Sequence, residues 1–156
     1  GWIGYTLSKT ERKIDGINEG NWYNARQDRP HDLTVVMTYQ FNTKWSISGL
    51  FVYNTGNAVT FPIGKYNLNG QTIYQYSARN ADRLPDYHRL DISVNYDFKK
   101  RGSYESSLNF GLYNVYGREN AYTITFRDNP DDPNKTEAAQ NSLFRWVPSI
   151  SYNFKF

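Results

Sequence analysis

The chain contains no cysteine and only one methionine among its 156 residues. The absence of cysteine excludes disulfide bonds, thiolate-based zinc sites and catalysis by a thiol nucleophile. Long apolar runs are also missing, since the best of them, LTVVM from Leu33, is far shorter than the roughly 18 to 20 residues of a membrane-spanning helix. These absences exclude helical membrane spans but leave membrane strands open, because alternating strands are not detected by hydropathy.

Charge of one sign is not concentrated anywhere in the chain. The formal net charge is only +3, and lysine and arginine form no block that could follow a phosphate backbone. The composition therefore disfavours a nucleic-acid partner. The opening GWIGYTLSKT has neither an initiator methionine nor a charged leader, and it already alternates like a strand. We expect the chain to be a fragment of a longer protein.

What the chain has in abundance is alternation of apolar and polar residues with period two, the pattern of half-exposed strands. The pattern recurs in six segments, which cover residues 3–8, 32–41, 45–54, 88–98, 104–116 and 144–156. No segment with helical periodicity and proper caps competes, so the sequence predicts an all-β fold. In the last segment Pro148 cannot donate to a ladder, and we expect a local break or bulge there, with regular pairing from about Ser149.

The connections between these segments alternate in length. NTK and KKRGS are short, whereas residues 11–31, 55–85 and 118–141 are long and rich in Asn, Asp, Gly, Arg and Pro. Such alternation predicts an antiparallel up-and-down meander with both short turns at the end that carries Phe156, as in outer-membrane barrels. Because single-chain barrels begin at eight strands, about six strands must be completed by others, from the same chain or another.

Aromatic residues make up 17% of the chain, and their positions favour a membrane protein. Tyr and Trp prefer the boundary between hydrocarbon and headgroups, where the ring is apolar and its tip is solvated. One predicted girdle at the short turns contains Tyr39, Phe41, Trp45, Tyr96, Phe98, Tyr104, Tyr152 and Phe154. A second, at the opposite ends of the strands, contains Tyr53, Tyr116, Phe144 and Trp146.

A soluble or extracellular β-sandwich or β-barrel that binds a ligand is the alternative, since its strands also alternate. Its inner face would favour Val, Ile and Leu over Tyr at strand ends. Its outer face would carry more Lys and Glu than the Ser, Thr, Asn and Asp present here. Pattern alone favours the membrane barrel but leaves this alternative open.

Five segments carry a resemblance to a known family: WYNARQDRPHDLTVVMTYQF, WSISGLFVYNTGNAVTFP, RLPDYHRLDISVNYDF, SSLNFGLYNVYGRENAYTITF and PSISYNFKF. In order and spacing they resemble the C-terminal barrel strands of TonB-dependent outer-membrane receptors of the Bacteroidetes. The resemblance extends over essentially the whole chain. It implies that residues 1–156 are the C-terminal part of a large, 22-stranded transmembrane β-barrel, with the plug domain and N-terminal strands absent.

The resemblance also implies a function and partners. The whole protein would import a scarce nutrient (a metal chelate, vitamin, glycan or peptide) across the bacterial outer membrane, with its long loops extracellular and its C-terminus periplasmic. The implied partners are outer-membrane lipid, the remaining strands and plug, the TonB complex and the barrel-assembly machinery, with a surface lipoprotein left open. The ending departs from the FTFGLNLTF-like ending of the family's glycan importers, which argues against a polysaccharide substrate.

Residues with reactive side chains give no catalytic pattern. His31 and His88 lack convergent ligands or a paired nucleophile, so we expect structural hydrogen bonds at the barrel rim, no enzymatic activity and no cofactor. Asp128, Asp131 and Asp132 lack the order of a calcium loop, so a solvated loop is expected. Ligand contacts are expected from the long loops, where the candidates are Tyr66, Tyr74 and Tyr76.

Two further sets of residues follow from strand parity. Charges on the polar parity are predicted to face the barrel lumen: Arg89, Asp91, Asp97, Glu105, Arg145 and Lys155. The last residues form the second set, because a terminal aromatic preceded by apolar residues two and four positions back resembles the signal that barrel-assembly machinery recognises. That predicted signal comprises Ile150, Tyr152, Phe154 and Phe156.

Overall fold

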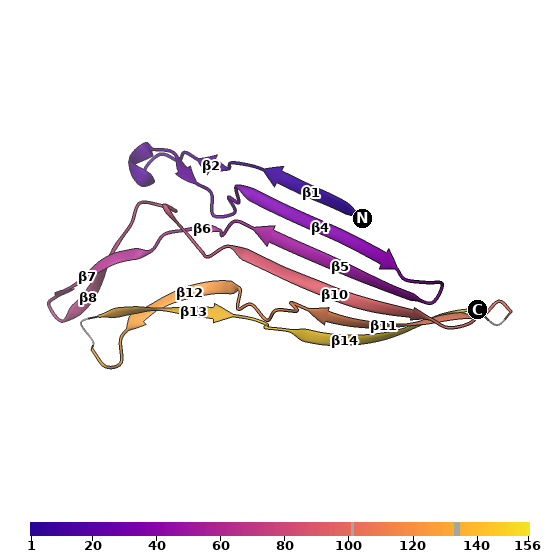
Figure 1. Ribbon diagram of the computed structural model, residues 1–156. Helices are drawn as coiled ribbons and strands as arrows, with labels where there is room; N and C mark the ends of the chain where they lie inside the picture. Colours follow the sequence, from indigo (N-terminus) through magenta and orange to yellow (C-terminus); the bar gives the residue numbers. More distant parts are fainter. Residues whose placement is uncertain (101, 133–134) are drawn as a thin grey trace.

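Six antiparallel strands form the main sheet of the protein, a computed structural model that describes residues 1–100, 102–132 and 135–156. The order of the strands in the sheet is their order in the chain (Figure 1). They are β1 (Trp2–Leu7), β4 (His31–Gln40), β5 (Trp45–Asn54), β10 (Tyr87–Asp97), β11 (Glu105–Tyr113) and β14 (Val147–Lys155). The predicted all-β meander of about six strands is therefore confirmed, with strand limits within a few residues of those expected.

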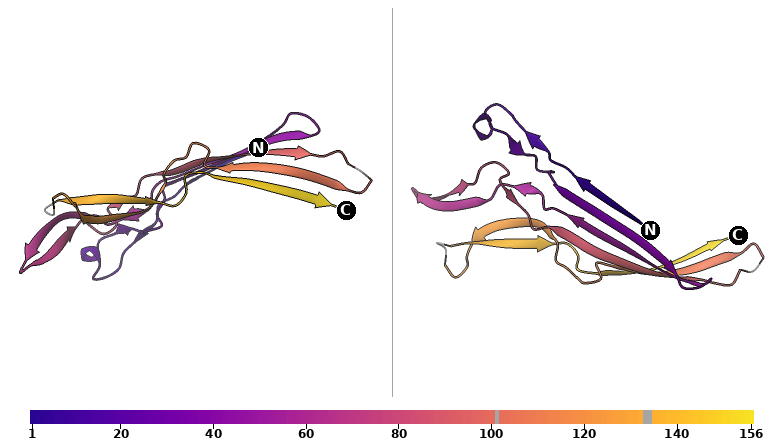
Figure 2. Two further views of the ribbon diagram at one scale, coloured as in Figure 1. Left: turned by 90° about the horizontal axis from the view of Figure 1, so that it is seen from below. Right: turned by 45° about the horizontal axis from the view of Figure 1, so that its top comes forward.

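The long and short connections lie at opposite ends of this sheet, as predicted. The short connections from β4 to β5 and from β10 to β11 lie at the end where the chain finishes (Figure 1). The loops 8–30, 55–86 and 114–146 all extend beyond the other end. Seen from below, the sheet is a single twisted layer, and none of the described strands forms a second sheet against it (left view of Figure 2).

The long loops contain hairpins of their own, in addition to the six strands predicted from the sequence. Residues Asn69 and Gly70 have φ of 52° and 80° and form a tight turn of the kind that Asn-Gly favours in hairpins. The described part of the chain has one helix, the 3-10 turn Asn18–Gly20. The paired loop strands are β2 (Glu11–Arg12) with β3 (Tyr23–Asn24), β6 (Ala58–Val59) with β9 (Asp82–Arg83), β7 (Pro62–Leu68) with β8 (Gln71–Tyr76), and β12 (Ala121–Asp128) with β13 (Thr136–Ser142).

The apolar side of the main sheet is not covered by any part of the described chain. Register places apolar residues beside one another in rows across the strands, for example Tyr39, Ile47 and Val94. Their side chains contact each other laterally but remain open above. Met37 is 67% exposed and Ile150 is 66% exposed, values that a packed core would not allow. Among the described residues, the buried apolar ones are Tyr23, Ala25 and Ala58, all of them in the long loops.

Both outer strands of the sheet present unpaired backbone groups. The Phe98 amide donates to the Ser106 carbonyl at 2.9 Å, so even-numbered residues of β11 bond to β10 and odd-numbered ones to β14. The Ser8 amide likewise donates to the Pro30 carbonyl at 3.0 Å, which directs the backbone of odd-numbered residues of β1 away from β4. The described strands therefore form an open sheet with two free edges rather than a closed barrel.

The prediction of a break at Pro148 is wrong. The register of β14 on β11 runs without a shift from Val147 opposite Tyr113 to Lys155 opposite Glu105. Pro148 lies opposite Leu112, an even-numbered residue of β11 whose backbone bonds to β10. The nitrogen of Pro148 consequently points to the free edge, where this ladder requires no donor.

Within the described ranges, no helix is long and apolar enough to cross a membrane.

Candidate functional site

A buried ion pair joins the first long loop to the second. Asp28, only 1% exposed, receives a hydrogen bond from the Thr10 amide at 2.6 Å and pairs with the Arg83 guanidinium. Arg83 also donates to the carbonyl oxygens of Asp28, at 2.8 Å, and of Gly56, at 3.2 Å. One arginine thus holds three backbone or carboxylate acceptors from two loops.

The ionisation of Asp28 is adjusted to this role. Burial alone would raise the pKa of its carboxyl, but the hydrogen bonds from Arg83 and the Thr10 amide and the charge of Arg83 outweigh that effect. The pKa of Asp28 is therefore below its ordinary value of 3.8, and the carboxylate is charged at neutral pH. The Asp28–Arg83 contact between the two loops is therefore an ion pair at neutral pH.

The base of the second loop is fixed against the end of β5 and the segment that leads into β10. Asp86 accepts hydrogen bonds from the Tyr53 hydroxyl at 2.6 Å and the Gly56 amide at 3.0 Å, and both bonds lower its pKa. A Cβ at Gly56 would lie 1.7 Å from the Leu84 carbonyl oxygen, so only glycine fits there. This close approach sets where the second loop leaves the sheet.

Further polar contacts hold all three loops together. The Asn80 side chain donates to the Asn24 carbonyl at 2.7 Å, which adds a second link between the first and second loops. Lys65 pairs with Asp128 at 2.7 Å and Phe61 packs on Phe126 with ring centroids 5.1 Å apart, which joins the second loop to the third. The three loops therefore contact one another and form one connected layer.

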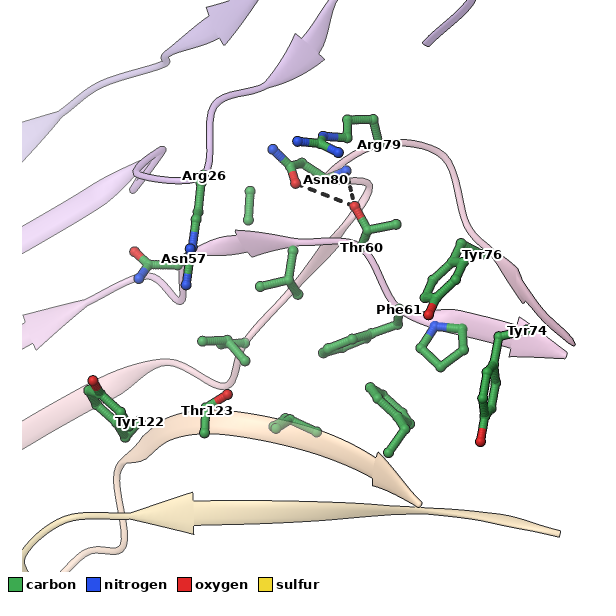
Figure 3. A pocket seen from close by; sticks show the side chains of 16 residues that line it. Arg26, Asn57, Thr60, Phe61, Tyr74, Tyr76, Arg79, Asn80, Tyr122 and Thr123 are labelled. Atoms are coloured by element: carbon green, nitrogen blue, oxygen red, sulfur yellow. Dashed lines mark hydrogen bonds between the residues drawn. The ribbon is translucent and has the colours of Figure 1, made fainter. Parts of the chain in front are cut away.

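A cleft of about 490 Å³ lies between the second and third loops, and we call it the loop cleft. Figure 3 shows Phe61, Tyr74 and Tyr76 on the side of the second loop, with Tyr122 and Thr123 of β12 opposite them. Arg26 and Arg79 complete its rim (Figure 3). The volume is in the range of small-molecule binding sites, roughly 300–1,000 Å³.

Two adjoining clefts extend from the loop cleft to the polar side of the sheet. One, of about 570 Å³, shares Arg26, Asn57 and Tyr122 with the loop cleft and reaches Tyr87 and Tyr113. The other, of about 330 Å³, is lined by Arg29 and Arg89 among others. The three clefts share lining residues and so adjoin one another between the loops and the polar face.

Two of the three tyrosines predicted as ligand contacts line the loop cleft. Tyr74 and Tyr76 are two residues apart on β8, so their side chains leave the same face of that hairpin. Tyr66 pairs with Ile73 and belongs to the opposite face, and it is not part of the lining. Their role in binding stays a prediction, but for Tyr66 the geometry gives no support.

The polar face of the sheet carries a connected cluster at the loop end. Arg89 donates to both carboxylate oxygens of Asp91, at 2.8 and 3.0 Å, and to the hydroxyls of Tyr87 and Tyr113, at 2.7 and 3.1 Å. Its guanidinium carbon lies 4.4 Å from the centre of the Tyr113 ring. Asp91 in turn accepts from the amide of Asn114, a fully buried residue that turns the chain out of β11. The cluster is a rigid polar surface at the base of the adjoining clefts.

Of the charges predicted to face a lumen, five lie on the polar parity of the sheet: Arg89, Asp91, Asp97, Glu105 and Lys155. Glu105 and Lys155 are direct partners in the register of β11 and β14. Arg145 is different, because β14 begins only at Val147 and Arg145 pairs with Glu119 inside the third loop. Its assignment to a strand face is corrected: it stabilises the loop.

Aromatic rings form an almost continuous band across the apolar side at the short-turn end. Representative contacts are Trp45 on Tyr96, with centroids 4.6 Å apart, and Phe98 on Tyr152, 6.2 Å apart. The Tyr104 and Tyr152 hydroxyls are 2.7 Å apart. The band contains every residue predicted for the first girdle, together with Phe156, and we call it the aromatic band: Tyr39, Phe41, Trp45, Tyr96, Phe98, Tyr104, Tyr152, Phe154 and Phe156. Its membrane role stays a prediction.

At the loop end of the apolar side, each histidine meets a tyrosine. His31 Nδ1 is 2.8 Å from the Tyr5 hydroxyl, and His88 Nδ1 is 2.8 Å from the Tyr116 hydroxyl. These are structural hydrogen bonds of the kind predicted. Phe144, predicted for the second girdle, precedes β14 and lines one of the adjoining clefts instead.

No metal or catalytic centre emerges from the described residues. They contain no group of three or more His, Asp or Glu side chains placed to hold a metal ion. Of the predicted acidic loop residues, Asp128 pairs with Lys65.

Comparison with known proteins adds no assignment: no family model matches the chain, and neither the curated proteins nor the solved structures include a significant match.

Several residues of the loop cleft escaped the sequence analysis. Tyr122 and Phe126 lie on β12, whose AYTITF alternates with period two and could have been detected as a strand. Arg26 and Arg79 follow no periodic pattern. Their position depends on the Asp28–Arg83 pair and on the Asn80 contacts, which link residues more than fifty positions apart.

Proposed function

We propose that residues 1–156 are the C-terminal part of the transmembrane barrel of a TonB-dependent outer-membrane transporter that imports a scarce nutrient. The observation that carries the proposal is the uncovered apolar side of the six-stranded sheet, bounded at one end by the aromatic band. In water such a surface would cause aggregation. In a bilayer, the lipid hydrocarbon would solvate the surface, and the aromatic rings would lie at the level of the headgroups.

The free edges support the same proposal. Unpaired amides on β1 and β14 would cost several kcal/mol each within hydrocarbon, so membrane insertion requires that further strands pair with both edges. A barrel of 22 strands with a plug inside would supply them, and the polar face with Arg89 and Asp91 would then line the lumen. The plug and the TonB complex would act through parts of the protein outside these residues.

Orientation follows from the distribution of the loops. Outer-membrane barrels place short turns in the periplasm and long loops outside. The long loops with the loop cleft would therefore be extracellular, and Phe156 periplasmic. On this proposal the clefts are the part of the wall that meets an arriving nutrient.

A soluble β-sandwich would need a second sheet over the apolar side. The four two-stranded sheets of the described chain lie in the loops and do not provide it. The test is to express the full-length gene product and follow its fractionation. We expect recovery in outer membranes, extraction only by detergent, and heat-modifiable mobility on gels; a monodisperse, water-soluble chain 1–156 would refute the barrel and favour the sandwich.

The last residue provides a second test. Phe156 is 83% exposed and touches Phe154 and Tyr104 only along the aromatic band. If it belongs to an assembly signal, deleting Phe156 abolishes membrane insertion in cells, while the refolded barrel in detergent keeps almost all its stability. A Phe156→Tyr control keeps a terminal aromatic and should insert normally. Normal insertion of the deletion variant would limit Phe156 to packing in the band.

A further inference from the structure

Two arginines at the loop cleft have charges that the fold does not use. Arg26 lies between β3 and β4, and Arg79 between β8 and β9. Within the described residues, neither guanidinium has a hydrogen bond or an ion pair. Arg83, Arg89 and Arg145, in contrast, each pair with a carboxylate. Both unpaired side chains are at the rim of the same hollow (Figure 3).

Carboxylates are missing from the described lining of this hollow. The described residues that line the three adjoining clefts include no Asp and no Glu. The nearby acids are occupied: Asp28 pairs with Arg83, and Asp82 accepts from the Ser77 hydroxyl at 2.6 Å and the Phe61 amide at 3.3 Å. Among its described residues the lining therefore contains guanidinium groups but no carboxylate that could pair with them.

The remaining lining offers flat apolar surfaces and neutral hydrogen-bond groups. Phe61, Tyr74, Tyr76 and Tyr122 present aromatic rings, and Asn57 and Thr60 present amide and hydroxyl groups (Figure 3). Aromatic rings bind ring-shaped ligands by stacking, and arginine forks bind carboxylates through two parallel hydrogen bonds. Rings and unpaired guanidinium groups in one hollow select for a ligand that has both features.

We propose that the loop cleft binds a carboxylate attached to a six-membered ring whose face can stack on an aromatic side chain, with Arg26 and Arg79 on the carboxylate and the tyrosines on the ring. This names the chemical class of the nutrient and rests on the proposed transport function. An acidic sugar and an aromatic acid share this chemistry. The test below separates these two sources.

The experiment uses the full-length gene product, purified from outer membranes in detergent, and isothermal titration calorimetry with two pairs of probes. Trigalacturonate and its methyl ester represent the sugar source; 3,5-dihydroxybenzoate and its methyl ester represent the aromatic source. In at least one pair the acid should bind about ten-fold more tightly than its ester, because only the acid can pair with the arginines. The pair that shows this preference identifies the source.

Variants then assign the preference to the cleft. Arg26→Gln and Arg79→Gln should each weaken binding of the preferred acid about ten-fold and leave its ester unchanged. Arg12→Gln removes the same charge from an exposed strand outside the clefts and should have no effect. Equal binding of acid and ester in both pairs, absence of binding by both acids, or unchanged binding in both cleft variants would overturn the proposal.

Each variant is first checked for heat-modifiable mobility in outer membranes. A folded, inserted protein that fails the binding test loses the carboxylate assignment but keeps the proposed transport function. A wild-type protein that does not insert contradicts the transport function itself.

Discussion

The main sheet and the long loops differ in whether the described chain itself covers their apolar side chains. In the sheet, six paired strands leave an apolar side that nothing in the described chain covers. In the loops, short-range hairpins, the Asp28–Arg83 pair and the contacts of Asn80 bury Tyr23, Ala25 and Ala58 without any outside help. The apolar side of the sheet thus needs an apolar contact from outside the described residues, whereas the loops pack against one another and form the clefts.

The largest effect is expected when a charged residue is placed on the apolar side of the sheet. Ile92 is the middle residue of β10, and Ile92→Arg should destabilise the inserted barrel by about 2–4 kcal/mol, since a charge at mid-bilayer must lose its hydration. Urea titration in bilayers, followed by heat-modifiable mobility, measures the change. Ser93→Arg is the matched control on the polar side and should be nearly neutral; equal effects of both variants would show that no lipid meets the sheet.

A substitution at Gly56, which lies close to Leu84, should cause a smaller loss of stability that is confined to the second loop. Gly56→Ala would place a Cβ 1.7 Å from a carbonyl oxygen and should destabilise the second loop by up to about 3 kcal/mol. Faster amide exchange in residues 55–86 with unchanged exchange in β4 and β5 would report it. The control, Gly64→Ala, has its nearest atom at 3.8 Å and should leave exchange unaltered.

The buried ion pair makes the first and second loops sensitive to acid. Because the pKa of Asp28 is lowered on folding, its contribution is complete above the ordinary value of 3.8 and declines as the pH falls through the lower native value. Between pH 4.5 and 8 the pair should therefore be constant. Asp28→Asn should cost about 1–2 kcal/mol of loop stability at neutral pH and remove the part of the acid dependence that comes from Asp28.

Limited pepsin digestion between pH 4.5 and 2, with cleavage sites mapped by mass spectrometry, compares the two proteins at each pH. The wild-type loops 8–30 and 55–86 should be protected at the upper pH values and become cleavable at the lowest. Asp15→Asn, which changes an exposed acid in the first loop, should behave as wild type. Acid-dependent cleavage that persists unchanged in Asp28→Asn would assign the effect to another group.

The smallest effect is expected at the proline of the last strand. Since the nitrogen of Pro148 points away from β11, Pro148→Ala removes no bond of the β11–β14 ladder and gives an amide to the strand that would pair with β14 in the proposed barrel. The free energy of unfolding should therefore not fall by more than about 0.5 kcal/mol. Ser149→Pro, one residue further, removes an amide that points at β11 and should cost several times more. Urea titration of both variants decides the matter, and a larger loss for Pro148→Ala would contradict the register.

The strands of the sheet could be predicted from the sequence, whereas the arrangement of the loops could not. Period-two alternation is a local pattern, so segments such as 88–98 could be recognised as strands and ordered into a meander from the lengths of their connections. The loop cleft could not be predicted, because Arg26 and Arg79 are brought together by contacts between distant residues. Pro148 was misjudged because its effect depends on which side its nitrogen faces, a property of register and not of composition.

The alternation of turn lengths also has a kinetic consequence. Closing the turn 41–44 costs far less chain entropy than closing the loop 55–86, which is roughly eight times longer; at about 0.6 kcal/mol per doubling, the difference is about 2 kcal/mol. The hairpins β4–β5 and β10–β11 should therefore form early as separate units, and the seam between β5 and β10 should close late. Because the Asp28–Arg83 pair and the β7–β8 hairpin shorten the path that must be ordered, the loop layer would act as a folding aid for that seam as well as a binding surface.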